Sequence, residues 1–444
     1  MRTLAASPTM EKTNTENLYT YFLAHPKICT DTRKIDKDSL FFALKGENFN
    51  GNKFALQALQ EGAAYAIVDE PEFLSDSRCL LVDDVLTALQ QLARHHRMQL
   101  DIPVIGITGS NGKTTTKELV ACVLRKKFKT HYTLGNLNNH IGVPLTLLAM
   151  PADTEIAVIE MGANHQGEIR LLSAIACPTH GIVSNVGLAH LEGFGGFEGV
   201  KKGKAELFDF LLASNGLAFV NRDNPHLMEM SANLSSRVLY GADGPVDCRG
   251  ELLESVPQVS MKWIYRNLAS GEIKANISGS YNFENILAAV TIGCHFAVPA
   301  DKIDAAVNDY VPSNMRSQMI HKEQCEILLD AYNANPTSMK AAIENFATLK
   351  ADKKTLILGD MMELGTHTDE EHRRLLQAVF EHSFERVILV GDYFGNSKAN
   401  YPVLHFQDTE LVAEWLRANQ VKGATYLIKG SRKMQLEKLV DCFV

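Results

Sequence analysis

Seven short apolar segments, each bounded by glycine, asparagine or aspartate, recur along the sequence. Stretches with helical periodicity lie between many of them. The segments are IPVIGITG from Ile102, EIAVIEMG from Glu155, HGIVSNVG from His180, CEILLDAYN from Cys325, KTLILGD from Lys354, RVILVGD from Arg386 and ATYLIKG from Ala424. Such runs are typical of buried parallel strands. The alternation therefore predicts an α/β fold whose functional sites lie at the carboxyl ends of the strands.

Length and two breaks in this pattern predict the domain organisation. A chain of 444 residues is expected to form about three domains. One boundary is predicted at the helix-like segment DVLTALQQLARHHRMQ, and the other at 311–314, because Pro312 disfavours helix at Val311. The predicted domains are residues 1–98, 99–313 and 314–444. We expect the last to be a Rossmann-like module, and residues 260–280 to form a hairpin or small sheet appended to the central domain.

Composition narrows the classes of partner. Acidic residues outnumber basic ones, 52 against 44, so the net charge is -8 and nucleic-acid binding is not expected. No apolar run reaches the roughly 18 residues that cross a bilayer, and we expect no secretory signal, with translation starting at Met1 or Met10. Eight scattered cysteines without a CxxC pair are typical of reduced thiols. We therefore expect a cytoplasmic enzyme. We also expect it to act as a monomer. The net charge does not exclude an anionic small substrate, because a local cluster of cations can bind one.

The segment TGSNGKTTTKELVACVLRKK has the context of a phosphate-binding loop, because a strand precedes it and a helix with an apolar face follows. Glycines allow backbone N–H groups to approach an anion, Lys113 supplies a positive charge, and Thr114 offers a hydroxyl to magnesium. The loop is shorter than the common GxxxxGK[ST] pattern, since residue 107 is isoleucine. The candidate nucleotide-binding residues are Thr108, Gly109, Ser110, Asn111, Gly112, Lys113 and Thr114. The alternative is a glycine turn that only begins a helix, with a solvated lysine.

Two further polar residues lie at or after the carboxyl end of a predicted strand. Glu160 ends the strand EIAVIE, where a carboxylate in the sheet of the phosphate loop can hold the metal of a magnesium nucleotide. His190 follows the strand of HGIVSNVG and precedes a glycine-rich stretch. The alternatives are a helix-capping or salt-bridge role for the glutamate and a structural role for the histidine.

Lys204 is unusual because it falls within the apolar face of a predicted helix over 198–212, whereas Lys202 points to the opposite side. A desolvated lysine loses its proton more easily. Beside bound magnesium, the neutral amine can react with carbon dioxide to give a carbamate, which is a negatively charged oxygen ligand. The alternative is a lysine that reaches solvent or pairs with a carboxylate such as Glu160.

Nine motifs together resemble the Mur ligases, from about Thr30 to the end of the sequence. In chain order they are GITGSNGKTTTKE, GNLNNHIGVPLTLL, EMGANHQGEI, NVGLAHLEGFGG, KKGKAELF, GSYNFENILAAV, DAYNANPTSM, LGDMMELG and LIKGSRKMQLE. NLNNHIGVP, DAYNANPTSM and LGDMMELG are similar to the branch that adds D-alanyl-D-alanine. The resemblance implies a three-domain α/β architecture, with a central parallel-sheet ATPase domain and a C-terminal Rossmann-like domain.

The resemblance implies ATP-dependent amide synthesis in the formation of peptidoglycan precursors. ATP would phosphorylate the terminal carboxylate of UDP-N-acetylmuramoyl-tripeptide, and the amine of D-alanyl-D-alanine would displace phosphate from the acyl phosphate. Two magnesium ions are implied, and the residues that would hold them are Thr114 and Glu160 for one, and His190 and a carbamylated Lys204 for the other. The implied catalytic residues are Lys113, Glu160, His190 and Lys204. Solvent, phosphate and His190 are the candidate acceptors for the proton of the amine.

The resemblance also implies substrate contacts outside the phosphate loop. For ATP they are Asn282 and Asn285 at adenine, Arg316 at the phosphates and Asp330 at the ribose. For the UDP-sugar and its peptide they are Thr32, Arg33, Gly46, Asn50, Gly51, Asn138 and Asn139. This chain has Asn50-Gly51-Asn52 where the family often has Asp-Gly-His. For the dipeptide they are Lys429, Ser431 and Arg432, with an ordinary surface loop as the alternative.

Two other functions stay open at this point. One is another ATP-dependent amino-acid or peptide ligase of the Mur or folylpolyglutamate type, which a panel of substrates would distinguish. The other is a nucleotide-binding scaffold without catalysis. The presence of Lys113, Glu160 and Lys204 weighs against the scaffold.

Overall fold

The computed structural model describes residues 12–312, 314–398 and 401–443. These residues belong to two compact units. The first unit holds the described residues up to Gly106 together with His131–Met161 and Arg170–Pro178, and the second holds Ile107–Thr130, Gly162–Ile169 and the described residues from Thr179 onward. The predicted starts Met1 and Met10 and the boundary residue Ser313 lie outside the described residues.

The N-terminal part of the first unit is a four-stranded parallel sheet with the order β1-β2-β5-β6. Its strands are β1 (Lys27–Cys29), β2 (Ser39–Phe42), β5 (Tyr65–Val68) and β6 (Cys79–Leu81), and its helices are α1 (Thr15–Ala24), α2 (Ala55–Glu61) and α3 (Val85–Met98). Phe41 of β2 packs with Ala58 and Leu59 of α2 in an apolar core. A small hairpin, β3 (Lys45–Gly46) and β4 (Phe49–Asn50), lies between β2 and α2 in sequence.

The largest sheet has ten strands, in the order β15-β14-β13-β12-β11-β10-β7-β9-β8, and β16 pairs with β14. The strands are β7 (Val104–Thr108), β8 (Thr130–Tyr132), β9 (Ile156–Glu160), β10 (His180–Val183), β11 (Leu217–Asn221), β12 (Arg237–Gly241), β13 (Cys248–Glu254), β14 (Val259–Tyr265), β15 (Leu268–Ala269) and β16 (Ile273–Ala275). The antiparallel pairing expected at 260–280 is confirmed, but these strands do not form a separate sheet. They extend the large sheet, because β13 pairs in parallel with β12 and antiparallel with β14.

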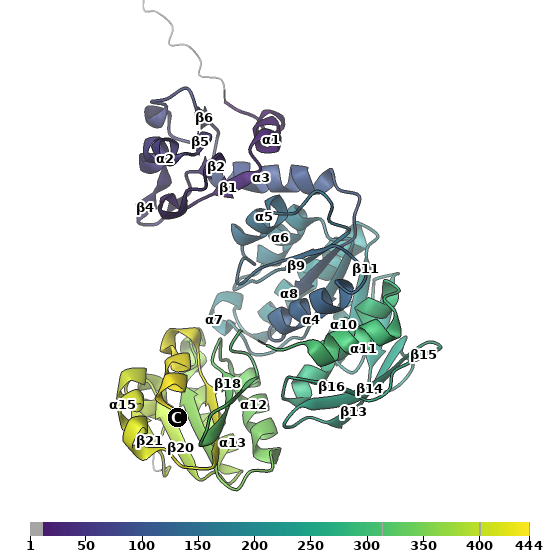
Figure 1. Ribbon diagram of the computed structural model, residues 1–444, viewed down its shortest axis with the longest axis vertical. Helices are drawn as coiled ribbons and strands as arrows, with labels where there is room; N and C mark the ends of the chain where they lie inside the picture. Colours follow the sequence, from purple (N-terminus) through teal and green to yellow (C-terminus); the bar gives the residue numbers. More distant parts are fainter. Residues whose placement is uncertain (1–11, 313, 399–400, 444) are drawn as a thin grey trace, which may run out of the picture. The chain divides into compact units, whose positions relative to one another are not determined.

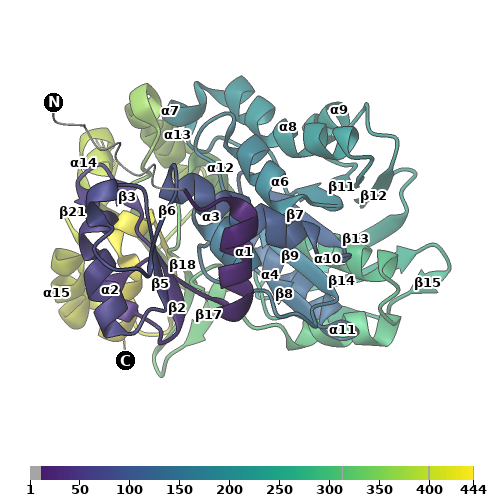
Figure 2. The ribbon, with the colours of Figure 1, turned by 90° about the horizontal axis from the view of Figure 1, so that it is seen from above.

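The helices in this region of the sequence include two that pack closely on each other. They are α4 (Lys113–Leu124), α5 (Gly142–Leu148), α6 (Glu168–Ala176), α7 (Leu191–Phe194), α8 (Phe197–Ala213), α9 (Pro225–Met230), α10 (Ser280–His295) and α11 (Ala300–Asp309). A Cβ at Gly293 of α10 would lie 2.4 Å from a methyl carbon of Val123 in α4. The missing side chain therefore permits the close contact of α4 with α10 (Figures 1 and 2).

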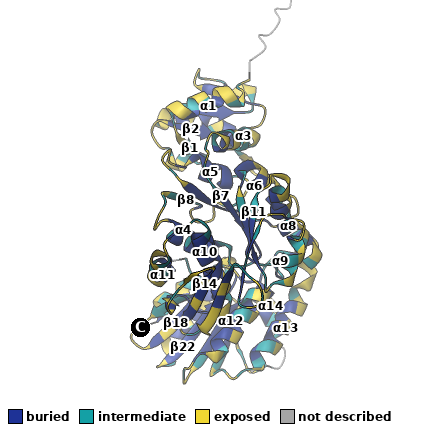
Figure 3. Cartoon of the chain, turned by 90° about the vertical axis from the view of Figure 1, so that its right-hand side faces the viewer, coloured by how far each residue is buried: buried dark blue, intermediate teal, exposed yellow. Residues whose placement is uncertain are grey.

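The C-terminal part of the second unit is a six-stranded sheet with the order β17-β18-β22-β19-β20-β21, parallel except for β17. Its strands are β17 (Gln318–His321), β18 (Cys325–Asp330), β19 (Lys354–Gly359), β20 (Arg386–Val390), β21 (Leu404–Phe406) and β22 (Ala424–Lys429), and its helices are α12 (Pro336–Thr348), α13 (Thr368–Phe380), α14 (Asp392–Ser397) and α15 (Thr409–Asn419). Helices α12 and α13 lie on one face and α15 on the other (Figure 1), so the inner strands β18, β19, β20 and β22 are mostly buried (Figure 3). The expected Rossmann-like arrangement is confirmed, as are all seven predicted strands.

No helix in the described parts of the chain combines the length and apolar character that a membrane crossing requires.

Candidate nucleotide and substrate sites

The phosphate loop between β7 and α4 depends on two glycines. Gly109 has φ 145°, and a Cβ there would lie 2.0 Å from Oγ of Ser184. Gly112 has φ 76°, and a Cβ there would lie 2.4 Å from Oδ1 of Asn285. Any side chain at either position would meet both a disfavoured backbone conformation and an occupied space. The glycines expected from the motif are thus required by the loop's own conformation.

The segment after β10 holds the phosphate loop in place. The Ser110 hydroxyl accepts a hydrogen bond from the backbone N–H of Gly187 at 2.9 Å. The backbone N–H of Asn111 donates to Oδ1 of Asn185 at 2.8 Å. Lys113 folds over the loop, and its Nζ donates to the carbonyl oxygens of Gly109 at 2.7 Å and Ser110 at 3.1 Å. The ordered loop leads into the first turn of a twelve-residue helix, whose positive dipole end favours an anion.

The predicted adenine residues lie together at the start of α10. Asn282 and Asn285 are both buried, and Nδ2 of Asn285 donates to Oδ1 of Asn282 at 2.9 Å. Asn285 also accepts a hydrogen bond from the hydroxyl of Thr116 in α4 at 3.0 Å. The two asparagines therefore connect the phosphate-loop helix to α10.

Lys204 lies on the buried face of α8, as its position in the sequence predicts. Lys204 is 1% exposed, and its Nζ donates to the carbonyl oxygen of Ala163 at 3.3 Å. Nζ also lies 4.9 Å from the ring centroid of Phe194 in α7. The ring can pack against α8 because residue 203 is glycine, where a Cβ would lie 2.5 Å from the ring. Burial, and then the positive charge of Lys113, lower the pKa of Lys204 well below its usual value. Lys204 therefore becomes a neutral amine at a lower pH than an exposed lysine does.

His190 begins α7 and faces the C-terminal sheet's loops within the second unit. Its Nδ1 contacts Oε2 of Glu363, and this hydrogen bond lowers the pKa of the glutamate. A pocket of about 370 Å³ lies here, lined by Asn164, His165, His190, Glu192, Gly193 and Glu363. Glu363 belongs to the motif LGDMMELG, but it is not among the site residues predicted from the sequence. A carboxylate three residues after the aspartate that follows a predicted strand was the available signal.

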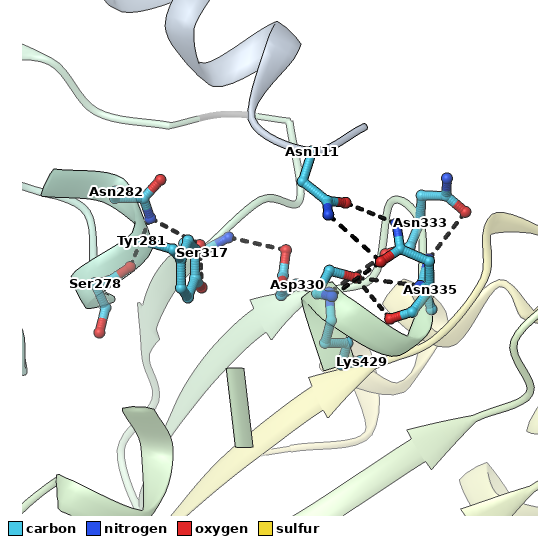
Figure 4. A network of polar contacts seen from close by, with 11 residues as sticks. Asn111, Ser278, Tyr281, Asn282, Ser317, Asp330, Asn333, Asn335 and Lys429 are labelled. Atoms are coloured by element: carbon cyan, nitrogen blue, oxygen red, sulfur yellow. Dashed lines mark hydrogen bonds and ion pairs between the residues drawn. The ribbon is translucent and has the colours of Figure 1, made fainter. Parts of the chain in front are cut away.

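A polar network connects the start of α10 with the C-terminal sheet (Figure 4). Nδ2 of Asn282 donates to Oγ of Ser317 at 3.2 Å, and the Ser317 N–H donates to Oδ1 of Asp330 at 3.3 Å. The other oxygen of Asp330 pairs with Nζ of Lys429 at 2.6 Å. The side chain of Lys429 is 2% exposed, and Asp330 neutralises its charge. Asp330 is also the acid predicted to face the ribose. The family resemblance instead implies that these two residues contact different substrates.

The phosphate loop and α12 also contact each other in this network. Nδ2 of Asn335 donates to Oδ1 of Asn111 at 2.7 Å (Figure 4). Asn335 is the N-cap of α12, and its own Oδ1 accepts from the N–H of Ser338. A residue of the motif DAYNANPTSM therefore both begins α12 and orients the tip of the phosphate loop.

Two predicted anion-binding arginines lie against one aromatic ring. The guanidinium carbon of Arg316 is 4.0 Å from the ring centroid of Tyr332, and that of Arg432 is 6.0 Å from it. Arg432 is also paired with Glu437 at 2.8 Å. Ser431 is buried, and its hydroxyl accepts from the N–H of Met362 at 3.0 Å. Of the three predicted dipeptide residues, Arg432 is therefore the exposed one.

In the first unit, Glu160 ends β9 as expected and is 1% exposed. Asn138 donates to its Oε1 at 2.8 Å, and the Glu160 N–H donates to the hydroxyl of Thr133 at 2.9 Å. Asn139 instead accepts from the N–H of Gly142 at 2.9 Å, at the start of α5. Asn138 therefore orients the predicted metal-binding carboxylate, whereas Asn139 orders the beginning of a helix.

The predicted uridine residues lie around β2, β3 and β4. Arg33, next to Thr32, forms a two-point ion pair with Asp31, whose pKa it lowers to about 2. Asn50 donates to the Glu70 carboxylate at 2.9 Å and accepts from the N–H of buried Asn52 at 3.0 Å. A Cβ at residue 51 would lie 2.4 Å from the carbonyl oxygen of residue 44, whereas the space beside residue 46 is open. The Asn-Gly-Asn sequence thus forms a compact, internally bonded turn.

Three family models match the chain in order. They are "Mur ligase family, catalytic domain" at residues 27–97, "Mur ligase middle domain" at 107–293 and "Mur ligase, glutamate ligase domain" at 315–432. Together with the phosphate loop and the two α/β sheets, these matches define a three-domain Mur ligase.

Individual relatives place the chain more narrowly. UDP-N-acetylmuramoyl-tripeptide–D-alanyl-D-alanine ligase of Bacillus subtilis is 36% identical, over 93% of this chain and 92% of the relative. The structure of MurF from Acinetobacter baumannii is 31% identical with a TM-score of 0.85, and covers 94% of this chain and 92% of that one. MurF of Thermotoga maritima in complex with ADP is 27% identical with a TM-score of 0.86, and covers 95% and 97%. The chain belongs to the MurF branch of the Mur ligases.

Proposed function

We propose that this protein joins D-alanyl-D-alanine to UDP-N-acetylmuramoyl-tripeptide at the expense of ATP, as a cytoplasmic step of peptidoglycan precursor synthesis. The observation that carries the proposal is the likeness to ligases named for this reaction along 93% of the chain, with the phosphate loop intact. The proposed domains are residues 1–98, 99–313 and 314–444. The proposed active form is a monomer.

The reaction has two steps. The terminal carboxylate of the tripeptide attacks the γ-phosphorus of ATP, so that an acyl phosphate forms and ADP leaves. The amine of the dipeptide then attacks the carbonyl carbon; the carbon–nitrogen bond forms, the bond from that carbon to the phosphate oxygen breaks, and the nitrogen loses a proton. Both steps depend on positioning and charge neutralisation more than on covalent chemistry by the protein.

The second unit supplies the proposed ATP site. The phosphate loop binds the phosphates through its backbone N–H groups, and Lys113 and Arg316 supply positive charge. Asn282 and Asn285 contact adenine, and Asp330 contacts the ribose. Support comes from the hydrogen-bonded path that already runs from α10 to Asp330 through Ser317.

Magnesium fits the donor atoms that the chain offers. Thr114 and Glu160 carry hydroxyl and carboxylate oxygens, which are the ligands Mg²⁺ prefers alongside water and phosphate. Among the described residues, no group of three or more His, Cys, Asp or Glu side chains could hold a metal ion by itself. His190 and a carbamate on Lys204 are the proposed ligands or orienting groups for a second ion. When bound, the ions neutralise the negative charge of the transferring phosphoryl group.

The remaining predicted residues are proposed to hold the other two substrates. The UDP-sugar and its peptide are assigned to Thr32, Arg33, Gly46, Asn50, Gly51, Asn138 and Asn139, and the dipeptide to Lys429, Ser431 and Arg432. Polar turns and an arginine near the surface suit phosphate and carboxylate groups. Residues that are already hydrogen-bonded, such as Ser431, contribute by ordering a loop.

An assay of phosphate release tests the proposal. The protein is incubated with ATP, UDP-N-acetylmuramoyl-tripeptide and D-alanyl-D-alanine, and then with each of the three left out. Phosphate release should require all three, and glutamate or single alanine should not replace the dipeptide. Release that is indifferent to the dipeptide would overturn the proposal, and equal use of another amino acid would assign a different ligase.

A further inference from the structure

Glu363 faces the pocket described above from the loop that follows β19. Its carboxylate meets His190, which comes from the loop after β10. The pocket of about 370 Å³ is within the size range of small-molecule sites. Both residues have positive φ, 52° for His190 and 63° for Glu363, a conformation that residues other than glycine rarely adopt. The surrounding structure therefore holds both side chains at the pocket against a local backbone preference.

Two buried side chains fix the loop that carries Glu363. Nδ1 of His372 is 2.7 Å from the carbonyl oxygen of Thr368, so Nε2 is the acceptor and receives the Met361 N–H at 3.1 Å. The hydroxyl of Ser431 accepts from the Met362 N–H at 3.0 Å. Two consecutive backbone groups before Glu363 are thus bound by side chains from other elements. The loop is preorganised, as a substrate-binding residue requires.

The base of the same loop is anchored as well. The carboxylate of Asp360 accepts from the N–H groups of Tyr393 at 3.0 Å and Phe394 at 2.9 Å, at the start of α14. The N–H of Ser431 donates to the Asp360 carbonyl oxygen at 3.2 Å. The ends of β19 and β22 and the start of α14 therefore hold the loop together.

The pocket has the charge for a cationic group. Glu192 and Glu363 both line it, and neither lysine nor arginine is among its described lining residues. Only Oε2 of Glu363 contacts His190, and Oε1 makes no hydrogen bond to a described residue. A carboxylate has room for several donors, so an ammonium or amine can bind Glu363 while His190 stays in contact. Among the substrates of the proposed reaction, the group that is cationic and must also reach the acyl carbon is the amino end of the dipeptide.

We propose that Glu363 binds the amino group of the incoming D-alanyl-D-alanine beside His190, and that His372 and Ser431 position it for this contact. The proposal rests on the proposed function. It assigns Glu363 to the second step of the reaction alone, since formation of the acyl phosphate involves no amine.

The test compares Glu363→Gln with the wild-type protein for each substrate. The variant should raise KM for the dipeptide roughly 10- to 100-fold, the loss expected for one hydrogen bond to a charged group. KM for ATP and for the tripeptide nucleotide should stay within about twofold. The exchange of labelled ADP into ATP, with the tripeptide nucleotide present and the dipeptide absent, should be unchanged. An exposed carboxylate at the end of α13 supplies the matched control, Glu381→Gln, which should leave every constant unchanged.

D-Lactyl-D-alanine, which carries a hydroxyl in place of the amine, sharpens the test. As an inhibitor it should bind wild-type protein more weakly than the dipeptide binds, and this difference should disappear in Glu363→Gln. An unchanged KM for the dipeptide, or a raised KM for the tripeptide nucleotide instead, would overturn the proposal. If Glu363→Gln lowers the unfolding temperature, Glu363→Asp decides: a KM between the wild-type and Gln values supports the contact, and a KM equal to that of Gln overturns it. Wild-type protein that forms no product would contradict the proposed function itself.

Discussion

At the scale of single residues, Lys204 is the most informative side chain. Its helical position predicted burial, and the structure places its Nζ between a backbone carbonyl and the ring of Phe194. Burial disfavours the charged ammonium, no described carboxylate forms an ion pair with it, and the charge of Lys113 adds to this effect, so the pKa of Lys204 is lowered. The neutral amine that burial favours is the form that reacts with carbon dioxide. The resulting carbamate would present an oxygen ligand to a bound magnesium ion.

Replacing Lys204 with alanine tests the carbamate. Turnover should fall roughly 100- to 1000-fold, the range for losing one electrostatic group in an active site. Small carboxylates such as formate should restore part of the activity, because they supply the missing oxygen ligand. The exposed neighbour gives the control, and Lys202→Ala should keep wild-type turnover. Full activity of Lys204→Ala would refute the role.

Lys429 gives a second test at this scale, because the structure pairs it with Asp330. Lys429→Met leaves a largely buried carboxylate without its partner, and should lower the free energy of unfolding by about 3 kcal/mol. If Lys429 acts through Asp330, KM for ATP should rise and KM for the dipeptide should not. The reverse pattern would support the direct dipeptide contact that the sequence predicts. Lys433→Met, at an exposed site in the same loop, should change neither quantity.

At the scale of elements, the phosphate loop is determined by its glycines. Gly112→Ala should weaken ATP binding at least about tenfold, since the new Cβ would displace Asn285 and strain a backbone at φ 76°. ATP affinity is measured by calorimetry. Gly271→Ala is the control, because the space around that turn glycine is open. Equal affinity of Gly112→Ala and the wild-type protein would contradict the loop's proposed role.

The amino end of β10 makes stability sensitive to acid. His180 lies against His295 and Phe296, and burial, then the neighbouring His295, lower its pKa from 6.5 to about 4. The unfolded chain therefore binds this proton more readily, so stability is full above pH 6.5 and falls as the pH drops toward 4. Allowing for partial solvent screening, the loss is about 2 kcal/mol.

Thermal unfolding between pH 4 and 7 measures this effect. His180→Phe should lose less stability on acidification than the wild-type protein, because the replacement cannot take up the proton. His140→Gln, at an exposed histidine, should retain the wild-type dependence on pH. An identical pH dependence of His180→Phe and wild type would contradict the assignment.

At the scale of the whole molecule, the sequence predicted individual strands better than the way in which the strands pair. The seven apolar runs are all strands, because buried parallel strands carry their signal within a few residues. The continuation of the large sheet through β12 to β16 was missed, since pairing between strands depends on contacts distant in sequence. The edge strands β17 and β21 are short and only partly buried, so their local signal is weak.

In the candidate sites, too, the local features were predicted from the sequence and the contacts between distant residues were not. The glycines of the phosphate loop and the burial of Lys204 follow from local rules and are found as expected. The Lys429–Asp330 pair and the contact of Glu363 with His190 join residues roughly a hundred or more positions apart, which no local pattern encodes. The net charge of -8 likewise hides the local cations, such as Lys113 and Arg316, that the anionic substrates require.

Oxygen-18 labelling tests whether the reaction passes through an acyl phosphate. The terminal carboxylate of UDP-N-acetylmuramoyl-tripeptide is labelled with oxygen-18, and the products formed with ATP and D-alanyl-D-alanine are analysed by mass spectrometry. An acyl phosphate predicts that each turnover transfers one labelled oxygen to the released phosphate, while the nucleotide peptide gains the dipeptide and keeps the other label. Phosphate without the label, or labelled phosphate without the dipeptide in the product, would contradict the proposed reaction.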